Sequence, residues 1–236
     1  MAEPLKALVA AAGAQSGVGI AVARRLAQAG FAVTLAAPTP RLHDRVAELR
    51  AEGLDVQGHL VDLADADEIA ALFDAVGPVA VLVNNTILGA ARGASAAALD
   101  PQVWSRGVAA NLAIAARLSR LFLPGMQTNG WGRVVTVGPV TGPQHMVPGR
   151  AAFDLAKAAL SDMTEALAQE VAQAGVTVNA VVPGWIAPDL PGVAPVSTVA
   201  DLASLVAFLA SPQASYVNGT TLVVEGGTVL QERDGV

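Results

Sequence analysis

Short apolar runs alternate with longer amphipathic stretches along the whole chain. Apolar runs bounded by turn-forming residues predict strands at about 5–12, 31–37, 55–62, 79–85, 132–138, 176–182 and 220–225. Between the runs, apolar residues recur three and four positions apart, which predicts helices near 17–29, 41–52, 65–76, 99–129, 150–174 and 198–210. Strands that alternate with helices pair in parallel through helical crossovers. The pattern therefore predicts an α/β protein with a doubly wound, parallel, seven-stranded sheet in a three-layer α/β/α arrangement.

The composition fits one large domain with a well-filled core. The chain has 236 residues, of which 53% are hydrophobic and only 14% are charged. Such a low charged fraction excludes a disordered chain and favours a sheet that is covered on both faces. Because no linker or repeat divides the sequence, we expect a single domain over residues 1–236.

Charge and cysteine content limit the classes of partner. The net charge is −6 and the 14 Lys and Arg residues form no stripe, which argues against nucleic acid as a partner. The absence of cysteine excludes thiolate metal ligands, and the sequence predicts no metal site. Residues 1–4 do not resemble a signal peptide, and the apolar runs are too short to cross a bilayer. We therefore expect a cytoplasmic protein without a membrane partner.

A glycine-rich turn follows the first predicted strand. Gly13, Gly17 and Gly19 lead directly into the helix predicted at 17–29. Backbone amides at the N-terminus of a helix can bind a pyrophosphate, since the helix dipole is positive there. Glycines also permit tight turns and close contact of a helix with a strand. The turn therefore indicates either a dinucleotide site or a packing requirement.

Further motifs in a fixed order give the chain a family resemblance. After the glycine turn come Asp62-Leu63, Asn84-Asn85, Asn111, Lys157, Pro183-Gly184 and the terminal stretch Val223-Val224-Glu225-Gly226-Gly227. With these motifs the chain resembles the short-chain dehydrogenase/reductase family over essentially its whole length. The resemblance implies a Rossmann-type fold and an oxidoreductase that binds NAD(P).

The resemblance also implies a role for individual residues. The turn of Gly13, Gly17 and Gly19 would hold the pyrophosphate of the cofactor, and Asp62 would accept a hydrogen bond from the adenine amino group. Asn85 would line the adenosine ribose, and Lys157 would hold the hydroxyls of the nicotinamide ribose. Asn111 would maintain a helical kink and a water that links the lysine to solvent.

The sequence departs from the family at the cofactor rim. Thr86-Ile87 stand where the family usually has Ala-Gly, and residues 36–39 offer neither an acid for NAD nor an arginine for NADP. Arg41 could reach a 2′-phosphate, but together with Arg45 and Arg50 it fits a solvated helix better. These departures predict that NAD(P) binding is weak or lost.

The largest departures from the family concern the catalytic residues. Phe153 stands four residues before the lysine, where the family has a tyrosine that exchanges the proton, and Pro139 stands at the position of the partner serine. Neither side chain has a hydroxyl group. Thr141 and His145 are alternative donors in the same loop, and the only tyrosine, Tyr216, fits a structural role. The connection between Gly184 and Asp201 is also too short for the helical lid of the family.

The helices at 102–128 and 149–174 are rich in Ala and Leu and predict an oligomer, because the corresponding helices of family dimers form a four-helix bundle. The leading hypothesis is a non-catalytic subunit that supports an active family member in a hetero-oligomer.

Two alternatives for the function remain open. One is an enzyme with reassigned catalytic residues, either a reductase or dehydrogenase or a non-redox lyase or isomerase. The other is a homo-oligomeric regulator that binds a nucleotide or no ligand.

Overall fold

The computed structural model describes residues 3–12, 17–85, 101–138, 151–183 and 198–224, with the side chains of 101, 103–111 and 151–158 left outside that description. The described strands form one parallel sheet in the order β3-β2-β1-β4-β5-β6-β7, which confirms the predicted fold class. The strands are β1 (Lys6–Ala10), β2 (Ala32–Ala37), β3 (Val56–Leu60), β4 (Val81–Asn84), β5 (Gly132–Val137), β6 (Val176–Pro183) and β7 (Thr221–Val224).

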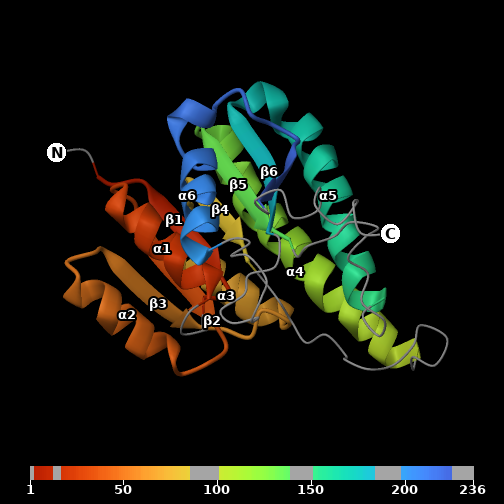
Figure 1. Ribbon diagram of the computed structural model, residues 1–236, viewed down its shortest axis with the longest axis horizontal. Coiled ribbons are helices and arrows are strands. Elements are labelled where there is room, and N and C mark those ends of the chain that lie inside the picture. The colour runs from red at the N-terminus through yellow and green to blue at the C-terminus, as the bar shows by residue number, and fades with distance from the viewer. Residues whose placement is uncertain (1–2, 13–16, 86–100, 139–150, 184–197, 225–236) are drawn as a thin grey trace, which may run out of the picture.

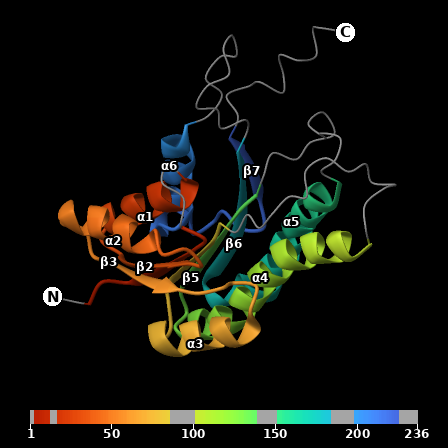
Figure 2. The ribbon, with the colours of Figure 1, turned by 90° about the horizontal axis from the view of Figure 1, so that it is seen from below.

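Helices cover both faces of the sheet and make the three layers visible in Figures 1 and 2. On one face lie α1 (Val18–Gln28), α2 (Leu42–Ala51) and α6 (Val199–Leu209), which share a hydrophobic cluster. On the other face, α3 (Ala66–Val76), α4 (Pro101–Thr128) and α5 (Ala151–Val171) share the second cluster. Short 3-10 turns follow α5 at Ala172–Ala174 and α6 at Pro212–Ala214.

Successive side chains of each strand point to opposite faces of the sheet, which explains why helices are needed on both faces. In β1, Ala7 and Val9 belong to the cluster under α1, whereas Leu8 and Ala10 belong to the cluster under α3 and α4. All four residues are fully buried. A parallel strand that is apolar on both faces has to be covered on both faces, and the two sets of helices provide that cover.

The C-terminal third of the sheet is held by buried polar groups. Asn179 Nδ2 donates to the Val217 carbonyl at 2.8 Å, and the Thr220 amide donates back to Asn179 Oδ1 at 3.3 Å. The fully buried Arg133 donates to the carbonyls of Gly132, Gly175 and Ser211 and stacks on the Trp131 ring. These bonds fix β5 and β6 to the segments that precede β6 and β7.

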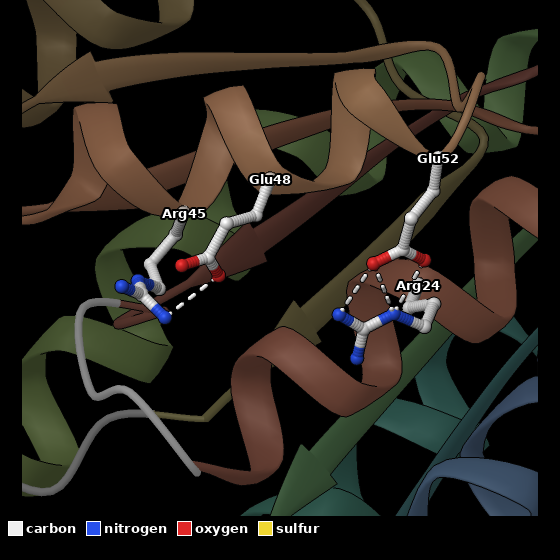
Figure 3. Close-up of polar contacts among 4 residues, drawn as sticks. All are labelled: Arg24, Arg45, Glu48 and Glu52. Atoms are coloured by element: carbon white, nitrogen blue, oxygen red, sulfur yellow. Dashed lines mark hydrogen bonds and ion pairs between the residues drawn. The ribbon is translucent and has the colours of Figure 1, made fainter.

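Two ion pairs lie on the outer surface, one between α1 and the end of α2 and one within α2 (Figure 3). Arg24 holds the Glu52 carboxylate through two nitrogens at 2.8–3.1 Å, and Arg45 pairs with Glu48 at 2.7 Å. The hydrogen bonds from Arg24 lower the pKa of Glu52. A carboxyl group with a lowered pKa in the folded state stabilises the protein above its unfolded pKa, and the contribution is lost as the pH falls. Since both side chains are more than a third exposed, the contribution is small.

Candidate functional site

The carboxyl ends of β1, β2 and β4 meet where the order of the strands reverses. The chain runs outward from β1 through β2 to β3 and then returns to place β4 on the other side of β1. Ala10 is in register with Ala36 on one side and with Asn84 on the other. Ligands of open α/β sheets bind in the crevice at such a switch point. This edge is therefore the candidate site.

Ala11 joins the three strand ends at this edge. Its amide donates to the Ala36 carbonyl at 2.7 Å, and its own carbonyl accepts from Asn85 Nδ2 at 3.1 Å. Its φ is +63°, and it is the only non-glycine residue with a positive φ in the described part of the chain. The left-handed conformation of an L-residue is strained by roughly 1–2 kcal/mol. The hydrogen bonds to the neighbouring strand ends hold Ala11 in that conformation.

Replacing Ala11 by glycine is expected to stabilise the protein by about 0.5–1 kcal/mol. Glycine adopts a positive φ without strain, and this gain outweighs the larger entropy of the unfolded glycine chain. Urea denaturation followed by circular dichroism measures the change. Ala10→Gly in the extended part of β1 is the matched control and should destabilise the protein. A loss of stability in Ala11→Gly would contradict the assigned backbone conformation.

Gly17 and Gly19 lie at the start of α1, as the sequence predicts for a phosphate-binding turn. Gly17 is the N-cap and provides no side-chain hydrogen bond, and the first turn of α1 contains no acidic residue. A Cβ at Gly19 would lie 2.9 Å from both Ala12 Cα and Asn85 Nδ2. Glycine is therefore required for α1 to approach β1 and β4, and this contact leaves the uncapped amides of α1 at the sheet edge.

Two adjacent asparagines place buried amide groups at the same edge. Asn84 and Asn85 are 1% and 6% exposed. Within the described residues, neither amide atom of Asn84 has a hydrogen-bond partner, and Asn85 Oδ1 has none either. A buried polar atom without a partner is unfavourable by roughly 1–3 kcal/mol. Together with the uncapped helix end, these atoms fit a polar, phosphorylated ligand of the dinucleotide type.

The adenine-binding part of the predicted site fits such a ligand less well. Asp62 is exposed just beyond β3, and its Oδ1 already accepts from the Ala64 amide at 2.9 Å. Its own amide donates to Glu68 Oε2 at 2.7 Å. At the end of β2, Ala37 is buried and the side chain that follows belongs to Pro38. The described rim thus offers no acid beside β2 and has a second carboxylate beside Asp62.

The remaining predicted residues are placed only in part. Asn111 lies in α4, whereas Phe153 and Lys157 lie one helical turn apart in α5, and these two helices pack against each other. Their side chains are not among those described. Other residues of the sequence argument lie outside the described residues, namely Gly13, Thr86, Ile87, Pro139, Thr141, His145, Gly184, Glu225, Gly226 and Gly227. Tyr216 is described and is fully exposed next to the turn that precedes β7.

Sequence reasoning did not identify three features of this edge, namely the strained Ala11, the unpartnered amide of Asn84 and the contact of Glu68 with Asp62. Only Glu68 had a recognisable signal, since an acidic residue three positions after Asp65 suggests a capping box. In the structure Asp65 caps α3 alone, while Glu68 bonds to Asp62 instead. Of the three arginines assigned to a solvated helix, Arg41 and Arg50 are exposed, whereas Arg45 is half-buried and pairs with Glu48. Arg50 Nε also bonds to the Val56 carbonyl.

Within the described residues, no cluster of three or more His, Asp or Glu side chains could hold a metal ion. None of the described helices combines the length and apolar character that a membrane span requires. Among the described residues, this edge presents the backbone amides at the start of α1, the side-chain amides of Asn84 and Asn85, and the carboxylates of Asp62 and Glu68.

Comparison with known proteins relates this chain to reductases. A family model described as short chain dehydrogenase matches residues 7–194. A 3-oxoacyl-[acyl-carrier-protein] reductase of Pseudomonas aeruginosa is 32% identical over 92% of this chain and 95% of its own length. An acetoacetyl-CoA reductase of Cupriavidus necator is also 32% identical, over 91% of this chain and 95% of its own length. The similarity extends through nearly the whole length of both relatives.

A solved structure supports the same relationship. A variant of an actinorhodin polyketide ketoreductase, solved with NADPH, superposes with a TM-score of 0.83 and 32% identity. The match covers 95% of this chain and 97% of that chain. A structure described as a betaketoacyl-ACP reductase has the same TM-score at 29% identity. The sheet and its flanking helices are thus arranged as in reductases that are named for acyl-chain substrates.

Proposed function

The chain belongs to the short-chain dehydrogenase family, and on that premise we propose that it is a non-catalytic subunit of an oxidoreductase. In this proposal the chain supports an active member of the same family in a cytoplasmic hetero-oligomer. The substrate class is a 3-oxoacyl thioester, because both relatives and the polyketide ketoreductase are named for reduction of such ketones. The active subunit would carry out the reduction.

The proposal depends mainly on Phe153. Reduction of a ketone requires a proton donor close to the oxygen that becomes negative, and the family resemblance assigns this role to a tyrosine. Phe153 has no titratable proton, and Pro139 has no hydroxyl group to hold the carbonyl. Loss of a general acid typically lowers the rate by about 10²–10⁴-fold. Two such losses in one site favour a supporting role over independent turnover.

We further propose that this chain binds NAD(P) weakly. The uncapped start of α1 and the amide of Asn85 are the groups that would hold the phosphates and ribose, and the cofactor would supply a hydride. Lys157 would hold the second ribose, and Asn111 would maintain the kink of α4. Against binding stands the rim after β2, where Ala37 and Pro38 offer neither an acid for NAD nor an arginine for NADP.

One alternative is an active reductase with reassigned residues. The similarity to named reductases over nearly the whole chain favours it. In that case Thr141 or His145 would donate the proton in place of the tyrosine. A histidine is suited to this role near neutral pH.

Turnover by the purified chain distinguishes the two functions. With acetoacetyl-CoA and NADPH we expect no loss of absorbance at the nicotinamide band above the enzyme-free rate. Calorimetry with NADH and NADPH should give dissociation constants above about 10 μM, the range of weak ligand binding. The alternative predicts turnover that Thr141→Val or His145→Ala reduces by about 10²-fold or more. Turnover of that kind would replace the subunit proposal.

A further inference from the structure

Asparagine precedes glycine at two places in the chain, Asn129-Gly130 and Asn218-Gly219. In such a pair the backbone nitrogen of the glycine can attack the side-chain Cγ of the asparagine, because glycine has no Cβ to hinder the approach. A bond forms between this nitrogen and Cγ, the bond from Cγ to the amide nitrogen breaks, and ammonia leaves with the proton of the glycine nitrogen. Water then opens the succinimide ring to aspartate or isoaspartate. Asparagine is accordingly among the thermolabile residues of proteins.

Asn129 lies directly after α4, in a turn that its side chain does not help to hold. The Gly130 amide donates to the Gln127 carbonyl at 3.1 Å and the Trp131 amide donates to the Met126 carbonyl at 3.2 Å, with Gly130 at a φ of +66°. These bonds are those of a helix that ends at a glycine. Asn129 and Gly130 are exposed, and within the described parts of the chain the Asn129 side chain has no hydrogen-bond partner. Fraying of this last turn therefore frees the Gly130 nitrogen to react.

Asn218 is exposed as well, but its side chain is bonded on both sides. Its Oδ1 accepts from the Val178 amide at 2.8 Å, and its Nδ2 donates to the Ala168 carbonyl at 3.2 Å. The Gly219 nitrogen, which would be the nucleophile, donates to the Val178 carbonyl at 2.9 Å. These bonds join the turn before β7 to β6 and α5. Reaction at Asn218 requires them to open together, whereas reaction at Asn129 requires only the end of one helix to open.

We propose that Asn129 is a site of spontaneous deamidation in the folded protein, that Asn218 is protected, and that the change at Asn129 loosens the end of α4. The inference is independent of the proposed function, since this turn lies where β5 begins, at the edge of the sheet opposite the candidate site. Exposure does not separate the two asparagines, and the hydrogen bonds do. The additional bonds of Asn218 make opening rarer there, which should make Asn129 react at least about tenfold faster.

Deamidation of Asn129 disturbs the turn in two ways. Isoaspartate lengthens the backbone, and either product places a negative charge at the C-terminal end of α4, where the helix dipole is already negative. The following residues are closely packed. The Gly130 carbonyl lies against Gly175, where an added Cβ would overlap it, and Trp131 stacks on the buried Arg133. We therefore expect the deamidated chain to be less stable than the natural one.

Ageing of the purified chain at slightly alkaline pH tests the choice of site. Peptides that contain the two Asn-Gly pairs are followed by mass spectrometry, which detects the conversion of an amide into an acid. In the folded chain Asn129 should be lost at least about tenfold faster than Asn218. In a sample kept unfolded in guanidinium, the two should react at similar rates, because only the local sequence then differs. A ratio in the folded chain no larger than in the unfolded chain would overturn the inference.

Asn129→Gln is the matched control for the effect on stability. Glutamine keeps the amide but closes the corresponding ring much more slowly, and replacement of the exposed, unbonded Asn129 side chain removes no contact. The aged natural chain should unfold at a lower guanidinium concentration than the fresh chain, measured by circular dichroism, whereas aged Asn129→Gln should match its fresh form. No shift in the natural chain, or an equal shift in both chains, would contradict the loosening of α4. Neither readout involves turnover, so the non-catalytic role is judged separately by the activity assays.

Discussion

Replacing Gly175 by alanine is expected to destabilise the protein by about 2–5 kcal/mol. Gly175 has a φ of +70°, and a Cβ there would overlap the carbonyl oxygen of Gly130. The left-handed conformation accounts for roughly 1–2 kcal/mol and the overlap with fixed backbone for roughly 1–3 kcal/mol more. Displacement of this turn would also disturb the bond between Arg133 Nη1 and the Gly175 carbonyl. Guanidinium denaturation of the purified variant measures the loss.

Gly30 provides the matched control for this prediction. Its φ is +92°, but a Cβ there meets no atom within 4 Å. Gly30→Ala should therefore lose only the conformational part, roughly 1–2 kcal/mol. Equal losses in the two variants would show that backbone strain alone determines the effect and that the contact with Gly130 is unimportant.

In the mixed complex, activity is expected to depend on the tyrosine of the other subunit. When the chain is co-expressed with a complete family member, tyrosine-to-phenylalanine substitution in that member's active site should lower turnover by about 10²–10⁴-fold. The same change in this chain, Tyr216→Phe, is the matched control and should leave turnover unchanged. Tyr216 is fully exposed and far along the chain from the candidate site. Assays of each purified complex with saturating ketone and NADPH measure the effect.

The opposite pattern would place the chemistry in this chain. That pattern consists of turnover that survives loss of the partner's tyrosine but disappears in Lys157→Ala of this chain. Such a result would support the reassigned enzyme, since Lys157 would then take part in turnover, either by holding the cofactor ribose or by proton transfer.

The sequence predicts the fold closely because burial on both faces leaves a strong pattern. The strand expected at 176–182 is Val176–Pro183, and the helix expected at 99–129 is Pro101–Thr128. In each case the apolar period and the flanking turn residues are local signals. The order of the strands depends on contacts between distant segments, and the pattern predicted only a doubly wound parallel sheet.

The geometry of the site was less predictable because it depends on contacts between distant segments. Alanine has no local preference for a positive φ, so nothing near Ala11 signals its conformation. The cause lies in the Ala36 carbonyl and the Asn85 amide, which are far away in the sequence. Glu68 matches a capping pattern, yet it bonds to Asp62 in the preceding turn. Local patterns indicate which residues are at the edge, and tertiary contacts decide how they are bonded.

The carbonyls that hold Arg133 determine when the growing chain can close its core. The guanidinium lies in the fifth strand, whereas two of its acceptors belong to Gly175 and Ser211, 42 and 78 positions later. Burial lowers the pKa of Arg133, and a desolvated cation without acceptors is strongly unfavourable. A nascent chain that has not yet extended past Ser211 therefore lacks one of the three carbonyls that accept from the Arg133 guanidinium. We expect ribosome-bound chains to remain protease-sensitive around the fifth strand until that carbonyl has emerged from the exit tunnel.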